Sequence, residues 1–522
     1  MLGCTPRSTF GINETEVKAD DEYETEKPIE LQSKSSMSDK SSYTGTEVEE
    51  SPKEDAGGTE FSSALGIFFS CVGSVVGSGN IWRFPRIVAQ NSFDEGSLAF
   101  LIVWIFSLFL WSIPIIIIEF TVGRFTKSGP LISFSKFFGQ KLAFIGGWTV
   151  FVPFLISCYY NVIVGWCLYY VYYACATPEL PKNETESIGV FNSFTQESNY
   201  PVLCHTISLV LVTICVFGGL KWIEKVNTTL VTLLAIIILI TFGWALSLQY
   251  ADVGLQYLFT PAWSSLGSAE LWIQAFIQNA FDTGAGLGHY AVYSAYFKRS
   301  DASVIYAVTL PIINNLVSLI CAMSIFSTVF ATMISTRPTL TITAIQNLMK
   351  DSGPGSTGLT FTWIPVLYQT MGIAGRVLCG LFFICLSFAG LTTQISNVQL
   401  TTVTLKNCGG MLHRILLKIY INSPINARFG HYIATTIAVV ITFLLGVPAA
   451  LNITYLTNQW LVLVVVLLIL NIILVKCHID ILSKDDGQGY DPYHLEQVPY
   501  GQEEHGLVVE VEEKDVEPIN VF

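Results

Sequence analysis

Residues 71–85 read CVGSVVGSGNIWRFP, and this stretch decides the fold. It begins as an apolar helix and then places Gly73, Gly77 and Gly79 within seven residues. Lipid cannot satisfy bare backbone groups, so a glycine-interrupted helix at membrane depth is tolerated only where its backbone lines a cavity or binds a ligand. GxxxG spacing alone would also fit close helix packing. The residues that follow, GNIWRFP, include Asn80 and Arg83, and an apolar helix-packing surface needs neither side chain. The stretch therefore favours an ion and solute site.

The composition around this stretch is that of a multi-pass membrane protein. Of 522 residues, 51% are hydrophobic and 13% charged, and the mean hydropathy is +0.53. The net charge of −13 lies mostly in the two ends of the chain, so it predicts no nucleic-acid partner. Residues 1–60 and 478–522 are predicted to be disordered acidic tails, whose partners the sequence does not identify.

Apolar runs of about twenty residues, the length that crosses the hydrocarbon core, predict the spans. Ten are expected, near residues 63–88, 97–122, 144–174, 201–219, 228–249, 270–297, 304–334, 372–404, 430–447 and 456–477. Residues 61–250 would form a first group of five spans with an extracellular loop at 177–200. Residues 251–477 would form a second group with an extracellular lid loop at 336–370.

Lys and Arg gather in the loops that follow the even-numbered spans, which predicts that these loops and both termini are cytoplasmic. The plasma membrane is the expected location. Of the Asn-X-Ser/Thr sequons, Asn183 lies in an outer loop and is the expected glycosylation site. Cys175 and Cys204 bracket the same loop, and whether they pair stays open.

A second interrupted helix occurs five spans after the first. Residues 275–296 read AFIQNAFDTGAGLGHYAVYSAY, with Asp282 at the centre and three glycines behind it. Glycine-broken segments at corresponding places in two halves indicate a transporter binding site between inverted repeats. An ionised carboxylate at the bilayer centre costs at least about 2.5 kcal/mol, so Asp282 needs a cation, a proton or a basic partner.

The span near 372–404 carries SFAGLTTQISN. Thr392 and Thr393 can bond their own helix backbone, as many membrane threonines do. Beside two broken helices they can also offer hard oxygen ligands to sodium or a proton. No nucleophile and base arrangement, P-loop or metal cluster indicates an enzyme.

These motifs resemble those of the neurotransmitter:sodium symporters. The resemblance covers roughly residues 59–477 and rests on GSGNIWRFP, IPIIIIEFTVGRF, CYYNVIVGW, SGPG and SFAGLTT. It implies an all-α membrane protein with a LeuT-like 5+5 inverted-repeat bundle, in which helices 1 and 6 are broken.

The resemblance also implies two sodium sites. The second site falls on the carbonyls of Gly73, Val76 and Ala389 and the hydroxyls of Thr392 and Thr393. The first site falls on the carbonyl of Val75 and the side chains of Asn80, Asn314 and Asp282.

Chloride-requiring relatives hold the anion at positions that match Trp104, Gln278, Asp282, Asn314 and Ser318. This chain has a carboxylate at Asp282 where relatives have a hydroxyl. A fixed negative charge repels chloride and balances sodium. Chloride is therefore not expected to be required.

The substrate pocket implied by the resemblance comprises Gly77, Ser78, Gly79, Ile156, Tyr160, Phe281, Gly284, Leu287, Thr393 and Asn397. Amine-transporting relatives have Asp at the position of Gly77. Amides around Gly79, at the start of a half-helix, and the Tyr160 hydroxyl suit a carboxylate instead. The expected substrate is an amino acid or a related small zwitterion.

The gates depart from the family pattern. The outer arginine is present as Arg83, but its acidic partner is replaced by Asn458. The inner charged pair is replaced by Gly58 and Asn407, while the gating Tyr296 remains. The leading hypothesis is a sodium-coupled symporter that imports its solute by alternating access. A proton-coupled variant that uses Asp282 and a non-transporting solute sensor are the alternatives.

Overall fold

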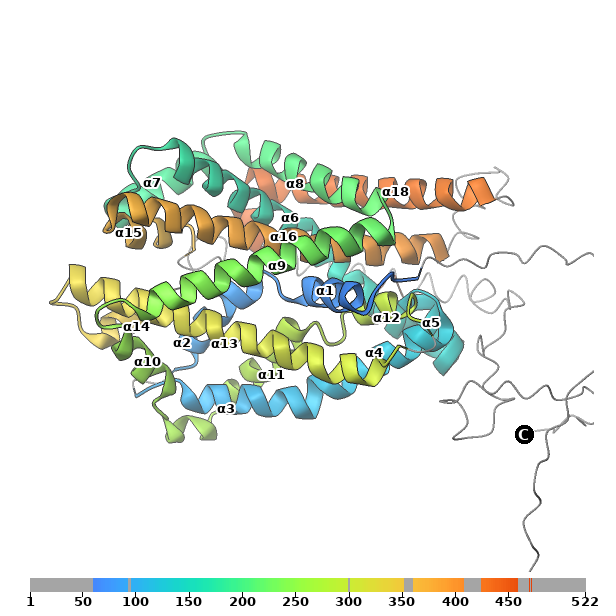
Figure 1. The fold of residues 1–522 in the computed structure, drawn as a ribbon, viewed down its shortest axis with the longest axis horizontal. Coiled ribbons are helices and arrows are strands. Elements are labelled where there is room, and N and C mark those ends of the chain that lie inside the picture. The colour runs from blue at the N-terminus through green and yellow to red at the C-terminus, as the bar shows by residue number, and fades with distance from the viewer. Residues whose placement is uncertain are drawn as a thin grey trace, which may run out of the picture. The chain divides into compact units, whose positions relative to one another are not determined.

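The computed structural model describes residues 60–92, 95–298, 301–351, 360–407 and 424–458, together with residues 469 and 471. The predicted tails and most of the predicted tenth span lie outside these ranges, apart from residue 60. Every regular element in the described ranges is a helix, and none is a strand. Figure 1 shows the helices running side by side along one bundle.

The first predicted span is two helices with a bend. Helix α1 covers Ala64–Val75, a π-helical turn η1 covers Gly79–Arg83 and α2 covers Phe84–Gln90. Ser63 caps α1, its hydroxyl accepting the Gly66 amide at 2.9 Å. The two helical segments meet at 51°. Pro85 lies where η1 passes into α2, and because it has no N–H it cannot continue the helical hydrogen-bond ladder there.

The remaining helices of the first half follow the predicted spans with differences in their limits. They are α3 (Leu98–Ser107), η2 (Leu108–Ser112), α4 (Ile113–Thr126), α5 (Pro130–Phe138), η3 (Gln140–Leu142), α6 (Ala143–Ala176), α7 (Glu184–Thr195), α8 (Tyr200–Phe217) and α9 (Leu220–Leu246). Helix α9 begins eight residues before the predicted span at 228, because Lys221 and Lys225 exclude its first turns from an apolar window. The predicted outer loop at 177–200 contains α7, a helix in its own right.

The second half repeats the order of long and broken helices. It comprises α10 (Ala251–Phe259), η4 (Trp263–Gly267), α11 (Ala269–Thr283), α12 (His289–Ser294), α13 (Ser303–Thr336), α14 (Ile342–Lys350), α15 (Ile364–Gln369), α16 (Gly372–Asn407), α18 (Pro424–Leu451) and α19 (Ile453–Asn458). The predicted lid at 336–370 thus contains α14 and α15.

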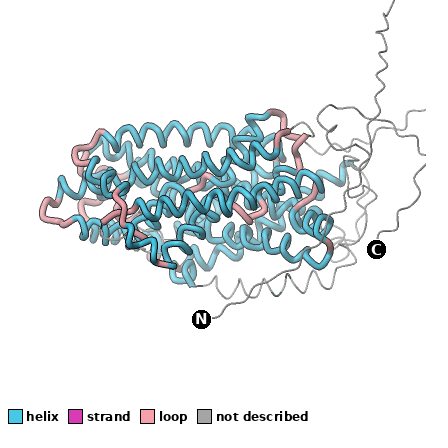
Figure 2. Tube along the Cα trace, turned by 90° about the horizontal axis from the view of Figure 1, so that it is seen from below, coloured by secondary structure: helices cyan, strands magenta, loops and turns pink. Residues whose placement is uncertain are grey.

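Seven described helices are long and apolar enough to cross a membrane, and the bent α1–α2 pair makes eight. The predicted span at 270–297 does not pass this test, because it is divided between α11 and α12 and carries several polar residues. Figure 2 shows non-helical segments inside the bundle as well as at its ends. Interior breaks of this kind need partners for their free backbone groups.

Helices at corresponding places in the two halves pack against each other. The pairs are α6 with α16, α8 with α18, α4 with α13 and α1 with α12. Figure 1 shows α6, α8, α16 and α18 together along one side of the bundle and α3, α4 and α13 along the other. The two broken helices therefore lie between these groups, where their interruptions are shielded from lipid.

Candidate solute and sodium site

A cavity of about 50 Å³ lies where the two helix breaks meet α6 and α16. Its lining contains nine of the ten residues predicted for the substrate pocket, namely Gly77, Gly79, Ile156, Tyr160, Phe281, Gly284, Leu287, Thr393 and Asn397. It also contains Ser74, Val75, Asn80, Asp282 and His289. A water needs about 10–15 Å³ of such volume, so the cavity has room for a small solute only.

Ser78, the tenth predicted residue, does not line the cavity but fixes a residue that does. Its amide and hydroxyl both donate to the Tyr160 hydroxyl oxygen, at 3.1 and 2.8 Å. A tyrosine hydroxyl carries one proton beside its lone pairs. With both acceptor positions taken by Ser78, the Tyr160 proton remains for Thr393 beside it or for an acceptor group of a solute.

Glycine at position 77 leaves the space that such a solute would use. A Cβ there would lie 2.9 Å from the Thr393 Oγ1 and 3.1 Å from the Tyr160 hydroxyl oxygen. At Gly79 a Cβ would lie 3.2 Å from the Phe281 ring. Side chains at these positions would occupy the polar corner of the cavity.

The residues of the predicted second sodium site come from α1 and α16, which pack together. The Thr393 hydroxyl donates to the Gly73 carbonyl oxygen at 3.4 Å, so the two helices meet at the predicted ligands. Thr392 is fully buried, and its hydroxyl bonds the Phe388 and Ala389 carbonyls of its own helix at 3.1 and 3.0 Å. Its hydroxyl oxygen thus lies next to the Ala389 carbonyl, a second predicted ligand.

The residues of the predicted first sodium site form one hydrogen-bonded cluster. Asn80 accepts the Gly77 amide at 2.8 Å and donates to Asn314 Oδ1 at 2.9 Å and to Ser318 Oγ at 2.8 Å. Asn80, Asn314 and Asp282 are all at most 2% exposed. Amide and carboxylate oxygens are ligands that hard cations accept.

The Asp282 carboxylate lies among the residues predicted for a chloride site in relatives. Gln278 Nε2 donates to its Oδ1 at 2.7 Å, and Ser318 Oγ approaches its Oδ2 at 3.3 Å. The Trp104 indole N–H is buried without a hydrogen-bond partner among the described residues. The formal negative charge of this cluster is therefore that of the Asp282 side chain.

Three buried ionisable residues of the cavity and the broken helices have no counterpart in the sequence prediction. Glu119 of α4, buried at 2% exposure, accepts the Gly286 amide at 2.7 Å inside the second break. His289, also 2% exposed, lines the cavity. Glu224 of α9, 6% exposed, bonds the residues before α1. An ionisable residue inside an apolar run was the available signal for Glu119 and His289, as it was for Asp282. Glu224 gave no such signal, because it stands between Lys221 and Lys225.

The gate residues are placed in part. The Arg83 guanidinium lies over the Phe281 ring, 4.1 Å from its centroid, so a cation–π contact closes one side of the cavity. The side chain of Asn458 and all of Gly58 lie outside the described residues. Tyr296 packs edge-on against Phe61, with ring centroids 6.5 Å apart, at the other end of the broken helix.

A side-chain latch joins the residues before α1 to Glu224 of α9. The Ser62 amide and hydroxyl donate to Glu224 Oε2 at 3.0 and 2.5 Å, and the Ser63 hydroxyl donates to Oε1 at 3.0 Å. These bonds tie the residues before α1 to α9. The start of the first broken helix is therefore held by one buried carboxylate and two serines.

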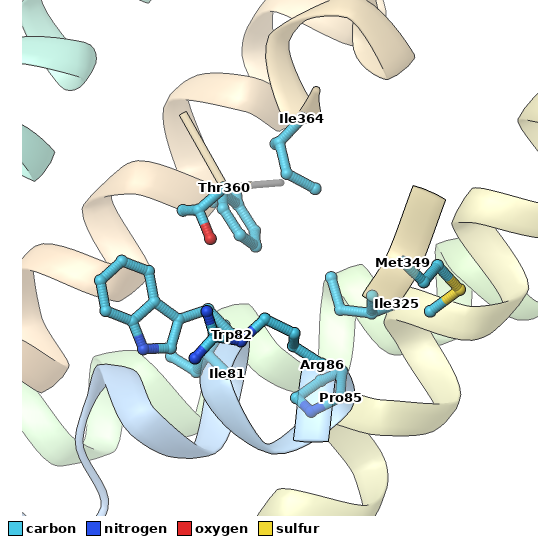
Figure 3. Close-up of a pocket in the computed structure, with 9 residues that line it drawn as sticks. Ile81, Trp82, Pro85, Arg86, Ile325, Met349, Thr360 and Ile364 are labelled. Atoms are coloured by element: carbon cyan, nitrogen blue, oxygen red, sulfur yellow. The ribbon is translucent and has the colours of Figure 1, made fainter. Parts of the chain in front are cut away.

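A second, smaller cavity of about 30 Å³ lies beside η1 and α2 (Figure 3). Trp82 and Arg86 face Met349 of α14 and Thr360 before α15 across it, and Ile325 of α13 closes its side. Gln90 of α2 also donates to the Lys350 carbonyl at 2.8 Å. The predicted lid segment thus packs over the second half of the broken helix.

Asn183 has the exposure that its predicted glycosylation needs. Asn183 is exposed and caps α7 by accepting the Glu186 amide at 2.9 Å with Oδ1. Cys175 is exposed, Cys204 is half-buried and both are free thiols. Glycosylation stays a prediction.

Comparison with known proteins identifies the family. The model of the sodium:neurotransmitter symporter family matches residues 59–198 and 190–415. An uncharacterized sodium-dependent transporter of Methanocaldococcus jannaschii is 30% identical over 352 residues, which cover 65% of this chain and 68% of that protein. The sodium- and chloride-dependent GABA transporter ine of Drosophila melanogaster is 27% identical over 65% of this chain, which spans only 38% of the fly protein.

The fold agrees with this assignment. The crystal structure of MhsT in complex with L-phenylalanine superposes with a TM-score of 0.62 at 27% identity, covering 76% of this chain and 81% of that one. The helical order matches the predicted LeuT-like bundle with broken helices. The chain therefore belongs to the sodium:neurotransmitter symporter family, as a sodium-coupled, multi-pass membrane transporter and not an enzyme.

Proposed function

We propose that this transporter imports an amino acid or a similar small zwitterion together with two sodium ions, by alternating access and without chloride. The observation that carries this proposal is the cavity between the two breaks, where Tyr160 has a hydroxyl proton to donate. A carboxylate of the solute is the matching acceptor. The phenylalanine bound to MhsT, which shares the fold, supports this substrate class.

The proposed independence from chloride rests on Asp282. Gln278 and Ser318 both donate toward its carboxylate, as they would toward an anion. A chloride ion bound by Gln278 and Ser318 would lie next to the negatively charged Asp282 carboxylate that these residues already bind. Repulsion between two like charges is strongly unfavourable in a buried site. The carboxylate takes over the charge-balancing task that an anion performs in chloride-dependent relatives.

The test is uptake of labelled amino acids into proteoliposomes, with sodium or choline outside and with chloride or gluconate as the anion. Wild-type accumulation should need sodium and should be the same in chloride and gluconate. The variant Asp282→Ser should transport in chloride and lose most uptake in gluconate. Asp252→Asn, an exposed carboxylate change on α10, is the control and should behave as the wild type does.

Three outcomes would contradict the proposal. A wild-type protein that needs chloride would remove the role given to Asp282. Sodium and amino acids that raise the thermal stability without any accumulation would favour the solute sensor. A proton gradient that drives uptake in the absence of sodium would favour the proton-coupled variant.

We also propose that the α7 and α14 end of the bundle faces outward at the plasma membrane, with both termini inside. The distribution of Lys and Arg and the exposed sequon at Asn183 support this orientation. In cells, Asn183→Gln should abolish a glycosidase-sensitive mobility shift. A shift that persists in this variant would place the glycan, or the orientation, elsewhere.

A further inference from the structure

His289 is the buried titratable side chain of the cavity to which no role has been given so far. It is the first residue of α12, directly behind the second helix break, and it is 2% exposed. Its Nε2 lies 2.8 Å from Asn397 Oδ1. Its Nδ1 is buried with no hydrogen-bond partner among the described residues, and a Cβ on Gly284 would lie 3.9 Å from it.

A chain of hydrogen bonds decides which imidazole nitrogen carries the proton. Gln394 Nε2 donates to the Ser157 backbone carbonyl at 3.1 Å and to the Ser157 hydroxyl at 2.6 Å. The carbonyl is only an acceptor, so it fixes the orientation of the Gln394 amide. Gln394 Oε1 is then turned away from Ser157 and is available as an acceptor for its neighbours.

The orientation of the Gln394 amide in turn determines the orientation of Asn397 next to the cavity. Asn397 Nδ2 approaches Gln394 Oε1 at 3.5 Å, one helical turn along α16, which leaves Asn397 Oδ1 facing His289. An acceptor oxygen at this place requires the proton on His289 Nε2. The neutral ring then presents a lone pair at Nδ1, beside Gly284 at the cavity wall.

A buried acceptor without a partner is costly, and a solute that supplies a donor removes that cost. We infer that His289 Nδ1 accepts a hydrogen bond from the side chain of the solute and so selects zwitterions with a hydroxyl or amide donor. The inference rests on the proposed function and narrows its substrate class. The relay from Ser157 through Gln394 and Asn397 keeps the acceptor in place before the solute enters.

Pairs of amino acids with the same shape test this selectivity. L-Threonine and L-valine differ in a hydroxyl donor, as L-asparagine and L-leucine differ in an amide. Binding to the purified protein in sodium is measured by thermal stabilisation and by isothermal titration. The wild type should bind the donor-bearing member of each pair about tenfold more tightly, the usual size of one buried hydrogen bond.

Two conservative variants distinguish the role of Nδ1 from that of Nε2. His289→Gln keeps a donor toward Asn397 and removes the Nδ1 acceptor, so the preference should fall below about twofold while valine and leucine bind as before. His289→Asn places an amide oxygen near the position of Nδ1 and should retain most of the preference. His431→Gln, a half-buried histidine of α18 outside the cavity, is the matched control and should keep the wild-type preference.

The outcomes show separately whether the role of His289 and the proposed transport function hold. Sodium-dependent binding without a preference in the wild type, or an unchanged preference in His289→Gln, would overturn the role of His289 and leave the zwitterion transporter standing. If no amino acid binds the wild type in sodium, both the inference and the proposed substrate class are wrong. A preference that His289→Gln removes and His289→Asn keeps would establish the inference.

Discussion

The two broken helices lie side by side at the cavity, yet their glycines differ in what they do. In the first break none of Gly73, Gly77 and Gly79 has a positive φ. In the second break Gly284, Gly286 and Gly288 have φ values of 70°, 87° and 73°, in the left-handed region. Only glycine adopts that region at little cost.

The space beside the glycines differs less. A Cβ at Gly73 would lie 3.2 Å from the Thr392 Cβ, and one at Gly77 would meet Thr393 and Tyr160. In the second break Gly284 and Gly288 are confined as well, and Gly286 has nothing within 4 Å. The first break therefore needs glycine for the space beside its backbone, where the ions and the solute are proposed to bind. The second needs glycine for the path of the chain itself, which Glu119 then holds through the Gly286 amide.

The largest effect is expected from removing the residue that holds the second break. Glu119→Ala leaves at least the Gly286 amide without its acceptor inside the protein, and each buried unpaired group costs about 1–3 kcal/mol. The variant should lose uptake and a monodisperse elution profile in detergent. Glu270→Ala, an exposed carboxylate in the first turn of the same broken helix, should be unaffected. A stable, active Glu119→Ala protein would show that the second break needs no such support.

Alanine substitutions in the second break separate the cost of a left-handed backbone from the cost of a close contact by the added Cβ. Gly284→Ala combines a φ of 70° with a Cβ 2.7 Å from Val75 Cγ1. It should lower stability by about 2–3 kcal/mol, of which the left-handed backbone accounts for about 1–2 kcal/mol. Gly286→Ala has the backbone penalty without the contact and should lose about 1–2 kcal/mol. Thermal unfolding without ligand measures both, and equal losses would mean that the Val75 contact is relieved by a small shift.

In the first break the same kind of change should weaken binding and spare stability. Gly77→Ala has an ordinary φ, but its Cβ would stand 2.9 Å from Thr393 Oγ1 and 3.1 Å from the Tyr160 hydroxyl. Sodium-dependent amino-acid binding should weaken about tenfold, while unfolding without ligand changes by less than about 1 kcal/mol. Gly243→Ala, in α9 with nothing within 4 Å, is the control. If stability falls and binding does not, the comparison between the two breaks is wrong.

The smallest effect concerns the latch at the start of the first broken helix. Glu224→Gln keeps one acceptor oxygen but loses the charge that strengthens its bonds to Ser62 and Ser63, a difference of about 1 kcal/mol. Hydrogen exchange in the first turn of α1 should become faster, with the global stability nearly unchanged. Lys225→Gln, on the exposed side of α9, should leave that exchange unaltered. Unchanged exchange in Glu224→Gln would mean that packing of Phe61 alone secures this end.

The sequence predicted most of the helical bundle, because membrane spans follow from the length and composition of local segments. Of the ten residues that it predicted for the substrate pocket, nine line one cavity in the structure. It did not predict the helices α7, α14 and α15 within the outer loop and the lid, because each is too short to form an apolar run of membrane length.

By itself the sequence determined the class of protein, the positions of both breaks and the family motifs that surround them. Only the tertiary structure decided which distant groups meet. Glu119 reaches Gly286 across 167 residues, His289 reaches Asn397 across 108, and Ser62 reaches Glu224 across 162. Glycine and apolar patterns determine structure within a few helical turns, so they can be read from a local segment. The role of a buried polar side chain depends on its hydrogen-bond partner, which only tertiary packing brings next to it.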